Sequence, residues 1–361
     1  MAKHVNWKRQ TVCMAAFMAI ALTAFLGKED SASAATVTKK LESGKITTKN
    51  GKLSVDKKSK AVTLKKSGTY TLSGKIGNYR VVVDEGNLKI TLVLNKVVCT
   101  NKTTSCIYNS KKSTSLTIQS AKGSTSQLTG PSKFVLAAGR STPDAVIFSD
   151  GDLKFSGSGK IVVKDISDNG DAVGSKQTLT LSSGTVNAAS KKNAFHADDI
   201  FINGGSLTAS SEDTAVKASR VVTINGGTSQ ITAVDKGIQG KAGVVIKKGT
   251  VNIRTSKSNN PKFDDFRGIS AGISDKNGKE AVAGSVLITG GNITINSYGD
   301  CIHAANNVTI SGGNFSLIST ADDGIQAKAL LTISGNPVLK IDVKGKKVKG
   351  ETKNIAANVK Y

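Results

Sequence analysis

The sequence predicts an all-β protein that winds into a parallel β-helix of about ten coils, with a period of about 22 residues. One apolar position returns in steps of 22, 21 and 22 residues, at Val173, Phe195, Val216 and Ile238. Between these positions Val and Ile alternate with Thr, Ser and Asn at period two, which is the pattern of a strand, and no segment has the period of a helix. Many of the 37 glycines separate one strand-like alternation from the next. Because a single coil cannot bury its own apolar face, the coils are expected to stack.

The N-terminal segment predicts export. A basic start is followed by an apolar run over residues 11–27 and by small residues up to Ala34, which together are typical of a secretory signal peptide over residues 1–34. We expect cleavage between Ala34 and Ala35 and a secreted, extracellular protein. The apolar run is about as long as the shortest membrane-spanning helices, so an uncleaved anchor is the alternative to a protein without stable membrane insertion.

The charge predicts a polyanionic partner or a solvated surface. The formal net charge of +24 falls to +22 when the signal peptide removes four cationic and two acidic side chains. Lysines concentrate in residues 35–67, expected to be a less regular leader or cap, and in a basic tail at residues 344–361. Such a field attracts acidic polymers, for example a uronate polysaccharide or an anionic cell wall. Signatures of nucleic-acid binding are absent.

Between these ends, successive motifs carry a resemblance. The strand-like runs at 68–75, 90–95 and 152–159 are followed by Gly-Gly coils that end in Asp-Asp-Gly-Ile-Gln-Ala at 322–327. This order resembles secreted bacterial carbohydrate-binding β-helix proteins with a pectate-lyase-like fold, over about Gly68 to Ile341. The resemblance implies a right-handed parallel β-helix at 68–343 that binds plant-type polysaccharide, pectic or cellulosic, and carries calcium. Residues 193–195 and 212–216 depart from the Asp-Gly-Ile corners of relatives.

Acidic residues recur at the expected coil corners. Carboxylates on adjacent coils would lie about 4.8 Å apart, so that a calcium ion about 2.4 Å from each oxygen fits between them. We therefore expect calcium ligands first at Asp300, Asp322 and Asp323, and next at Asp235 and Asp265. The alternative is that aspartate simply favours turns.

Two loops are expected to frame a binding site. The step from Ile246 to Ile288 is almost two periods long, and the excess over one coil falls at 256–264 and 271–280. Inserted loops on one face of a solenoid commonly bind ligands. The expected carbohydrate contacts there are Arg267, Lys262, Lys236, Tyr298 and Phe266. The single tryptophan, Trp7, lies in the signal peptide, so stacking on sugar rings is limited and polyuronate is expected to bind more tightly than cellulose.

Three functions remain open at this point. The first is a secreted, non-catalytic carbohydrate-binding protein assisted by calcium. The second is a polysaccharide lyase or hydrolase acting on uronate polymers, for which Arg267 and Lys236 are candidates by position only, while His196 and His303 are expected at outward corners. The third is a cell-surface adhesin or structural solenoid. Oligomeric state is not predicted.

The cysteine spacing leaves two alternatives. Cys99 and Cys106 could close a short loop through a disulfide, which an exported protein permits. The other possibility is that both thiols are small core side chains.

Overall fold

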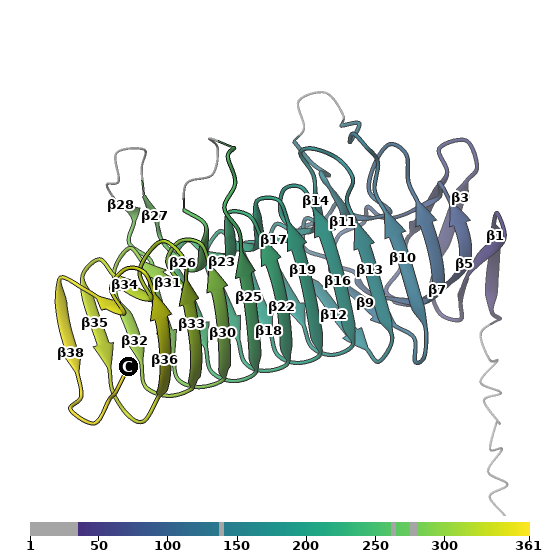
Figure 1. Cartoon of the computed structure of the whole chain (residues 1–361). Coiled ribbons are helices and arrows are strands. Elements are labelled where there is room, and N and C mark those ends of the chain that lie inside the picture. Colours follow the sequence, from purple (N-terminus) through teal and green to yellow (C-terminus); the bar gives the residue numbers. More distant parts are fainter. Residues whose placement is uncertain (1–34, 137–140, 261–264, 275–279) are drawn as a thin grey trace, which may run out of the picture. The chain divides into compact units, whose positions relative to one another are not determined.

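The computed structural model describes residues 35–136, 141–260, 265–274 and 280–361, and the unit from Ala35 to Tyr361 is a solenoid (Figure 1). Over these described residues the chain makes about twelve parallel turns with a period of about 23 residues. The predicted all-β, parallel β-helix is thus confirmed, with about two turns more than expected. None of the described segments is a helix that could span a membrane. The predicted signal peptide lies outside the described residues.

Each regular turn contributes one strand to each of three ladders. The first ladder consists of β5 (Gly68–Gly77), β7 (Lys89–Thr100), β9 (Ser115–Ser120), β12 (Leu153–Gly157), β15 (Thr178–Leu181), β18 (Asp199–Ile202), β21 (Val221–Ile224), β24 (Gly243–Ile246), β29 (Ser285–Ile288), β32 (Val308–Ile310), β35 (Leu330–Ile333) and β38 (Thr352–Ile355). The second continues from the end of β7 through β10 (Thr125–Thr129), β13 (Lys160–Lys164), β16 (Thr185–Ser190), β19 (Ser206–Ser211), β22 (Thr228–Ala233), β25 (Thr250–Thr255), β30 (Asn292–Ser297), β33 (Asn314–Ser319) and β36 (Val338–Val343). The third consists of β4 (Ala61–Leu64), β6 (Arg80–Val83), β8 (Ile107–Asn109), β11 (Ala145–Ser149), β14 (Asp171–Ser175), β17 (Phe195–Ala197), β20 (Thr214–Ala218), β23 (Lys236–Gly240), β26 (Arg267–Ala271), β31 (Ile302–Ala304), β34 (Ile325–Ala327) and β37 (Val348–Lys349).

The apolar repeat read from the sequence becomes a continuous inward stack. Phe195 is the register partner of Val216, Val216 of Ile238, and Ile238 of Ile269. Each of these side chains is at most 1% exposed. Each coil therefore buries its apolar side chains against those of the next coil. These contacts between coils, rather than the length of the strands, stabilise the fold.

Glycine corners allow the coils to approach closely. Gly205 and Gly227 occupy corresponding turns between the first and second ladders, with φ of 74° and 78°. A Cβ atom on Gly227 would lie 2.7 Å from the carbonyl oxygen of Gly205. Both the left-handed backbone and the close contact demand glycine there, which accounts for the Gly-Gly repeats in the sequence.

Regular structure extends beyond the predicted limits of 68 and 343. In the segment expected to be a less regular leader, β1 (Val37–Leu41) pairs antiparallel with β2 (Gly44–Thr48), and β3 (Leu53–Asp56) pairs with β4. In the basic tail, β37 and β38 pair with β34 and β35. Ile46, Val62 and Leu64 are fully buried, so the lysine-rich leader covers the open apolar end of the first coil.

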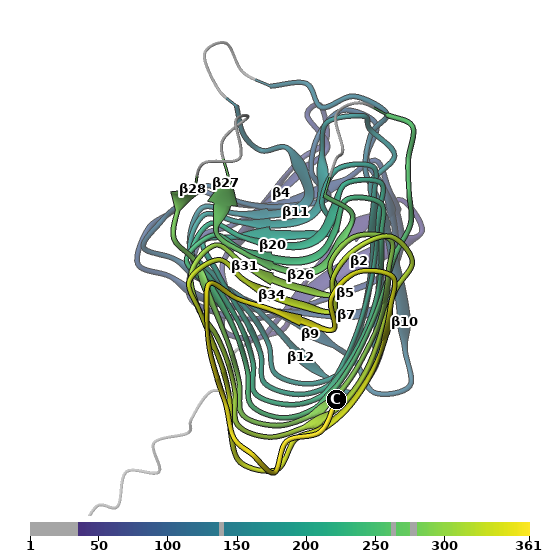
Figure 2. The same cartoon turned by 60° about the vertical axis from the view of Figure 1, so that its left-hand side comes forward.

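The two insertions lie where the sequence places them. Ile246 and Ile288 are direct register partners, so the extra residues loop out between β25 and β26 and after β26. The second insertion contains the antiparallel pair β27 (Ile273–Ser274) and β28 (Glu280–Val282). Figure 2 shows this pair on the side of the solenoid formed by the third ladder. The described part of the second insertion therefore lies beside the outer surface of that ladder.

The cysteines are core side chains. Cys99 and Cys106 are free and buried, with Cys99 Sγ 3.3 Å from the Tyr79 oxygen and Cys106 Sγ 3.4 Å from the Thr129 oxygen. A hydrogen bond with Cys106, together with burial, raises the pKa of the Cys99 thiol. The structure therefore has no disulfide between Cys99 and Cys106, and both thiols are core side chains.

Asp165 makes stability depend on pH. Its side chain accepts hydrogen bonds from the Ser167 and Ser190 hydroxyls, but burial raises its pKa to about 6. Between about pH 4 and 6 the folded state keeps a proton that the unfolded chain has released, so stability falls as pH rises through that window, by about 3 kcal/mol at most. Denaturant unfolding at pH 4 and pH 7 should show the parent losing about 3 kcal/mol more stability over this range than Asp165→Asn, since the other titrating groups act equally in both proteins. The exposed Asp342→Asn is the control, and an unchanged pH dependence in Asp165→Asn would contradict the assignment.

Candidate functional site

Four successive coils carry a charged side chain two residues before the buried isoleucine of their third-ladder strand. Lys236 and Arg267 are register partners. Backbone hydrogen bonds continue the same row to Asp300 and then to Asp323. Positions that are far apart in the sequence are thus one coil apart in space. We call Lys236, Arg267, Asp300 and Asp323 the charged row.

The N-terminal half of the charged row is an ion-pair network. Lys236 Nζ lies 2.7 Å from Asp235 Oδ2 and 2.9 Å from Asp265 Oδ2, and Arg267 lies 3.0 Å from Asp265 Oδ1. Burial opposes ionisation of Asp265, but Lys236 and Arg267 outweigh it and lower its pKa. Burial also opposes the charge on Lys236, yet Asp235 and Asp265 raise its pKa. These two cations are therefore held in place and already neutralised.

The C-terminal half of the charged row gathers carboxylates. One oxygen each of Asp300, Asp322 and Asp323 lies within 4.8 Å of the other two. Asp300 and Asp323 are buried, whereas Asp322 is exposed. Burial and, next, the charge of Asp322 raise the pKa of Asp300 to about 7. Three acids this close repel one another, so the group favours a proton or a cation.

Cations of the chain only partly compensate this acidic group. Lys349 Nζ lies 2.9 Å from Asp323 Oδ2, while Arg267 Nε is 3.7 Å from Asp300 Oδ2. With its amide in the orientation that satisfies both neighbours, Gln326 donates to Asp300 Oδ2 at 3.0 Å and accepts from Lys349 Nζ at 2.7 Å. Sequence reasoning missed Gln326 and Lys349. Their only signal was the coil repeat, which makes Gln326 the register partner of both His303 and Lys349.

The two candidate histidines, His196 and His303, differ in their exposure. His303 lies beside the charged row but is only 1% exposed. Burial, followed by the charges of Arg267 and Lys328, lowers its pKa to about 3. His303 alternates with the core residues Ile302 and Ala304, which agrees with the expected outward position, but its side chain is covered and not accessible. His196 is partly exposed, and its Nδ1 lies 2.9 Å from Asp171 Oδ2.

The predicted aromatic contacts face each other. The rings of Phe266 and Tyr298 meet edge to face with centroids 5.6 Å apart. Phe266 is 7% exposed, and Lys257 Nζ lies 5.4 Å from the centroid of the Tyr298 ring. The contact between the two rings, the burial of Phe266 and the position of Lys257 over Tyr298 leave little aromatic surface on which a sugar could stack.

The structure brings most of the predicted residues together. Lys236, Arg267, Phe266 and Tyr298 all lie on or beside the same outer surface as the acidic group. Lys262 lies outside the described residues. Among the described aspartates, Asp235 and Asp265 pair with cations and are not part of the three-carboxylate group. The metal and sugar contacts themselves remain predictions.

Comparison with known proteins assigns the chain to a family. A solved structure, "Structure of the polysaccharide lyase-like protein from C. thermocellum, Gadolinium derivative", shares 22% sequence identity over 85% of this chain and 90% of that chain, with a TM-score of 0.41. No curated protein matches the chain. A family model described as "Carbohydrate-binding domain-containing protein" matches residues 57–324 and 270–359. Since those residues are most of the chain, the protein belongs to the family of carbohydrate-binding domain-containing proteins.

Proposed function

We propose that the protein is exported and binds an acidic polysaccharide at the charged row without cleaving it, with the help of a calcium ion. The observation that carries the proposal is the convergence of Asp300, Asp322 and Asp323 within 4.8 Å. Two of these carboxylates are buried, where uncompensated negative charge is costly. A divalent cation would offset most of that negative charge and could accept further oxygen ligands from a glycan.

The donor set fits calcium. Calcium takes six to eight oxygen ligands in flexible geometry, and three aspartates supply up to six carboxylate oxygens. Asp322 is exposed, so water or a sugar carboxylate could complete the shell from the solvent side. Lys349 Nζ pairs with Asp323 Oδ2 and would have to move aside. Calcium would supply a bridge between protein and glycan carboxylates.

The surroundings favour an acidic glycan over a neutral one. Neutral sugars usually require flat, accessible aromatic rings, whereas Phe266 and Tyr298 pack against each other. The exported form, with a net charge of +22 once residues 1–34 are removed, would attract a polyanion at distances over which salt screens the attraction. Polygalacturonate therefore suits this surface better than cellulose.

The protonation states support binding without cleavage. Lyase chemistry needs a base that can take a proton, and the positional candidates were Lys236 and Arg267. The neighbouring aspartates raise the pKa of Lys236, which keeps it protonated, and an arginine in an ion pair is a poor base. His303 is neutral but buried, so it is not accessible to a polymer.

We expect the secreted form to bind polygalacturonate more tightly than cellulose. Binding should weaken with a chelator and as sodium chloride rises, because an ion bridge and exposed charge pairs carry it. Titration calorimetry against both polymers, with calcium or with EDTA, checks this. Ultraviolet absorbance of the same mixtures would reveal unsaturated products of a lyase. Tighter, salt-independent binding to cellulose, or release of unsaturated product, would overturn the proposal.

A further inference from the structure

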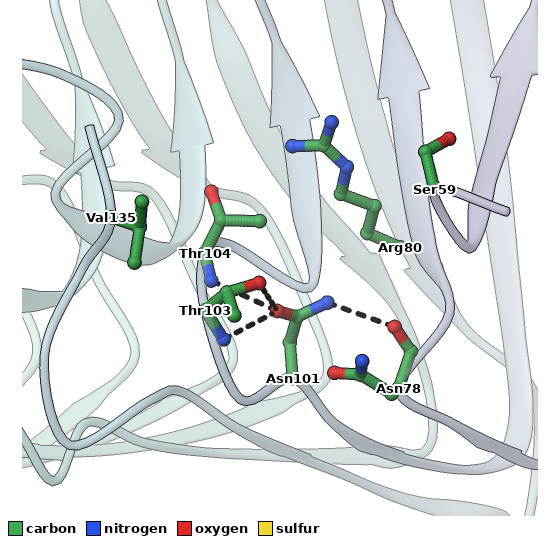
Figure 3. A pocket seen from close by; sticks show the side chains of 7 residues that line it. All are labelled: Ser59, Asn78, Arg80, Asn101, Thr103, Thr104 and Val135. Carbon is green, nitrogen blue, oxygen red and sulfur yellow. Dashed lines mark hydrogen bonds between the residues drawn. The ribbon is translucent and has the colours of Figure 1, made fainter. Parts of the chain in front are cut away.

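A pocket lies on the N-terminal coils, several turns away from the charged row. It has a volume of about 310 Å³. Figure 3 shows Arg80 extending between Ser59 on one side and Thr104 on the other. In β6 the alternate residues Val81 and Val83 are buried in the core, so period two turns Arg80 outward. The wall is formed by Ser59, Asn78, Arg80, Asn101, Thr103, Thr104 and Val135.

Hydrogen bonds hold the floor of this pocket rigid. The Asn101 side-chain oxygen accepts the backbone N–H groups of Thr103 at 3.1 Å and Thr104 at 2.9 Å. Its Nδ2 donates to the Asn78 carbonyl oxygen at 3.1 Å (Figure 3). The Val135 N–H donates to the Thr103 oxygen at 2.7 Å, which ties the loop after β10 to the same corner. A pocket braced in this way is preorganised, and preorganisation reduces the cost of binding.

The pocket has one charge and no internal counter-charge. Of the described residues that line it, none carries a carboxylate. Within the described part of the chain the Arg80 guanidinium has no ion pair, unlike Arg220 and Arg267, which both pair with aspartates. A guanidinium offers a planar pair of donors that matches a carboxylate. The Arg80 guanidinium is therefore available to pair with an anionic ligand.

The rest of the wall suits a sugar ring. Ser59, Thr103 and Thr104 offer hydroxyl groups that can donate to or accept from sugar hydroxyls. Val135 is 66% exposed and presents an apolar surface to ring C–H groups. The volume is at the lower end of small-molecule sites, which are about 300–1,000 Å³. A single sugar residue with a carboxylate would match the charge, the hydroxyl groups and the volume of this pocket.

We propose that this pocket is a second subsite, which holds the carboxylate of a single uronate residue through Arg80 and needs no calcium. The inference rests on the proposed function for the class of glycan but not on the acidic group near Asp300. The polymer would then be held at two separated places, one dependent on calcium and one independent of it. Two linked contacts raise the avidity for a long chain over that for a short one.

The test uses trigalacturonate in excess EDTA, which removes the calcium contribution. Titration calorimetry should show weak binding by the parent protein. Arg80→Ala should weaken that binding by about tenfold to a hundredfold, because a hydrogen bond to a charged group is lost. Arg80→Lys should fall between the two, since lysine keeps the charge but not the paired donors. The exposed Arg254→Ala, on β25, is the matched control and should bind like the parent.

Several results would overturn the subsite. These are unchanged affinity in Arg80→Ala, equal weakening in Arg254→Ala, equal affinity for the neutral cellotriose, or displacement of trigalacturonate by an equal concentration of inorganic phosphate. Binding in calcium that Asp323→Asn abolishes, with no binding in EDTA, would remove this subsite and leave the proposed function standing. Binding that depends on Arg80 but is unaffected by calcium and by Asp323→Asn would support this subsite and would contradict the calcium site of the proposed function. Melting curves of the Arg80 variants check that the fold is retained.

Discussion

Asp323→Asn is expected to weaken calcium binding by about a hundredfold, since even outer-shell changes at metal sites cost tenfold to a hundredfold. The substitution removes a charged oxygen from the group with Asp300 and Asp322. Asparagine keeps the shape and an oxygen that can accept the Lys346 N–H, which now donates to Asp323 Oδ1 at 2.7 Å. Lys349 loses its partner but is exposed, so the fold should tolerate the change.

Calcium titration and melting curves measure this effect. A ligand that binds only the native state stabilises it by about 2.7 kcal/mol at a hundred times its Kd. The melting temperature of the parent should therefore rise with calcium and fall with EDTA, while that of Asp323→Asn should hardly respond. The exposed Asp342→Asn makes the same charge change elsewhere and is the control. A parent protein that melts at one temperature in calcium and in EDTA would rule out the site.

Phe195→Ala is expected to cost about 3–5 kcal/mol of unfolding free energy, the usual range for truncating a buried phenylalanine. Phe195 is 1% exposed and stacks between Val173 and Val216 on the adjacent coils. Both neighbours are smaller and belong to hydrogen-bonded ladders, so they cannot move far enough to fill the cavity. In a solenoid the loss also weakens the contacts with both neighbouring turns.

Phe201→Ala is the matched control. Phe201 lies in β18, the next strand along the chain, on the partly exposed side of that strand. Its truncation should cost about 1 kcal/mol or less, as is usual for substitutions near the surface. Urea unfolding of both variants measures the difference. Equal costs would contradict the inward stack.

Repetition explains how much of the fold the sequence predicted. Few folds accommodate a period-two strand pattern that returns once in every coil. Phe195, Val216 and Ile238 could therefore be assigned to the inward stack from the sequence alone. The long step from Ile246 to Ile288 likewise located the two insertions. The same reasoning failed at the ends, because covering an exposed coil requires only a few buried residues such as Ile46, which show no period.

The composition of the site followed from the sequence, whereas its pairing came from the coil geometry. Periodicity placed Asp300, Asp322 and Asp323 on adjoining corners, since equivalent positions of a solenoid must stack. It could not show that Lys349 reaches Asp323, that Asp265 holds both Lys236 and Arg267, or that His303 is buried. Those outcomes depend on the directions and reach of long side chains within a few ångströms. Repeating backbone interactions set the spacing of the coils, but which charges meet is a matter of three-dimensional packing and of the solvation lost there.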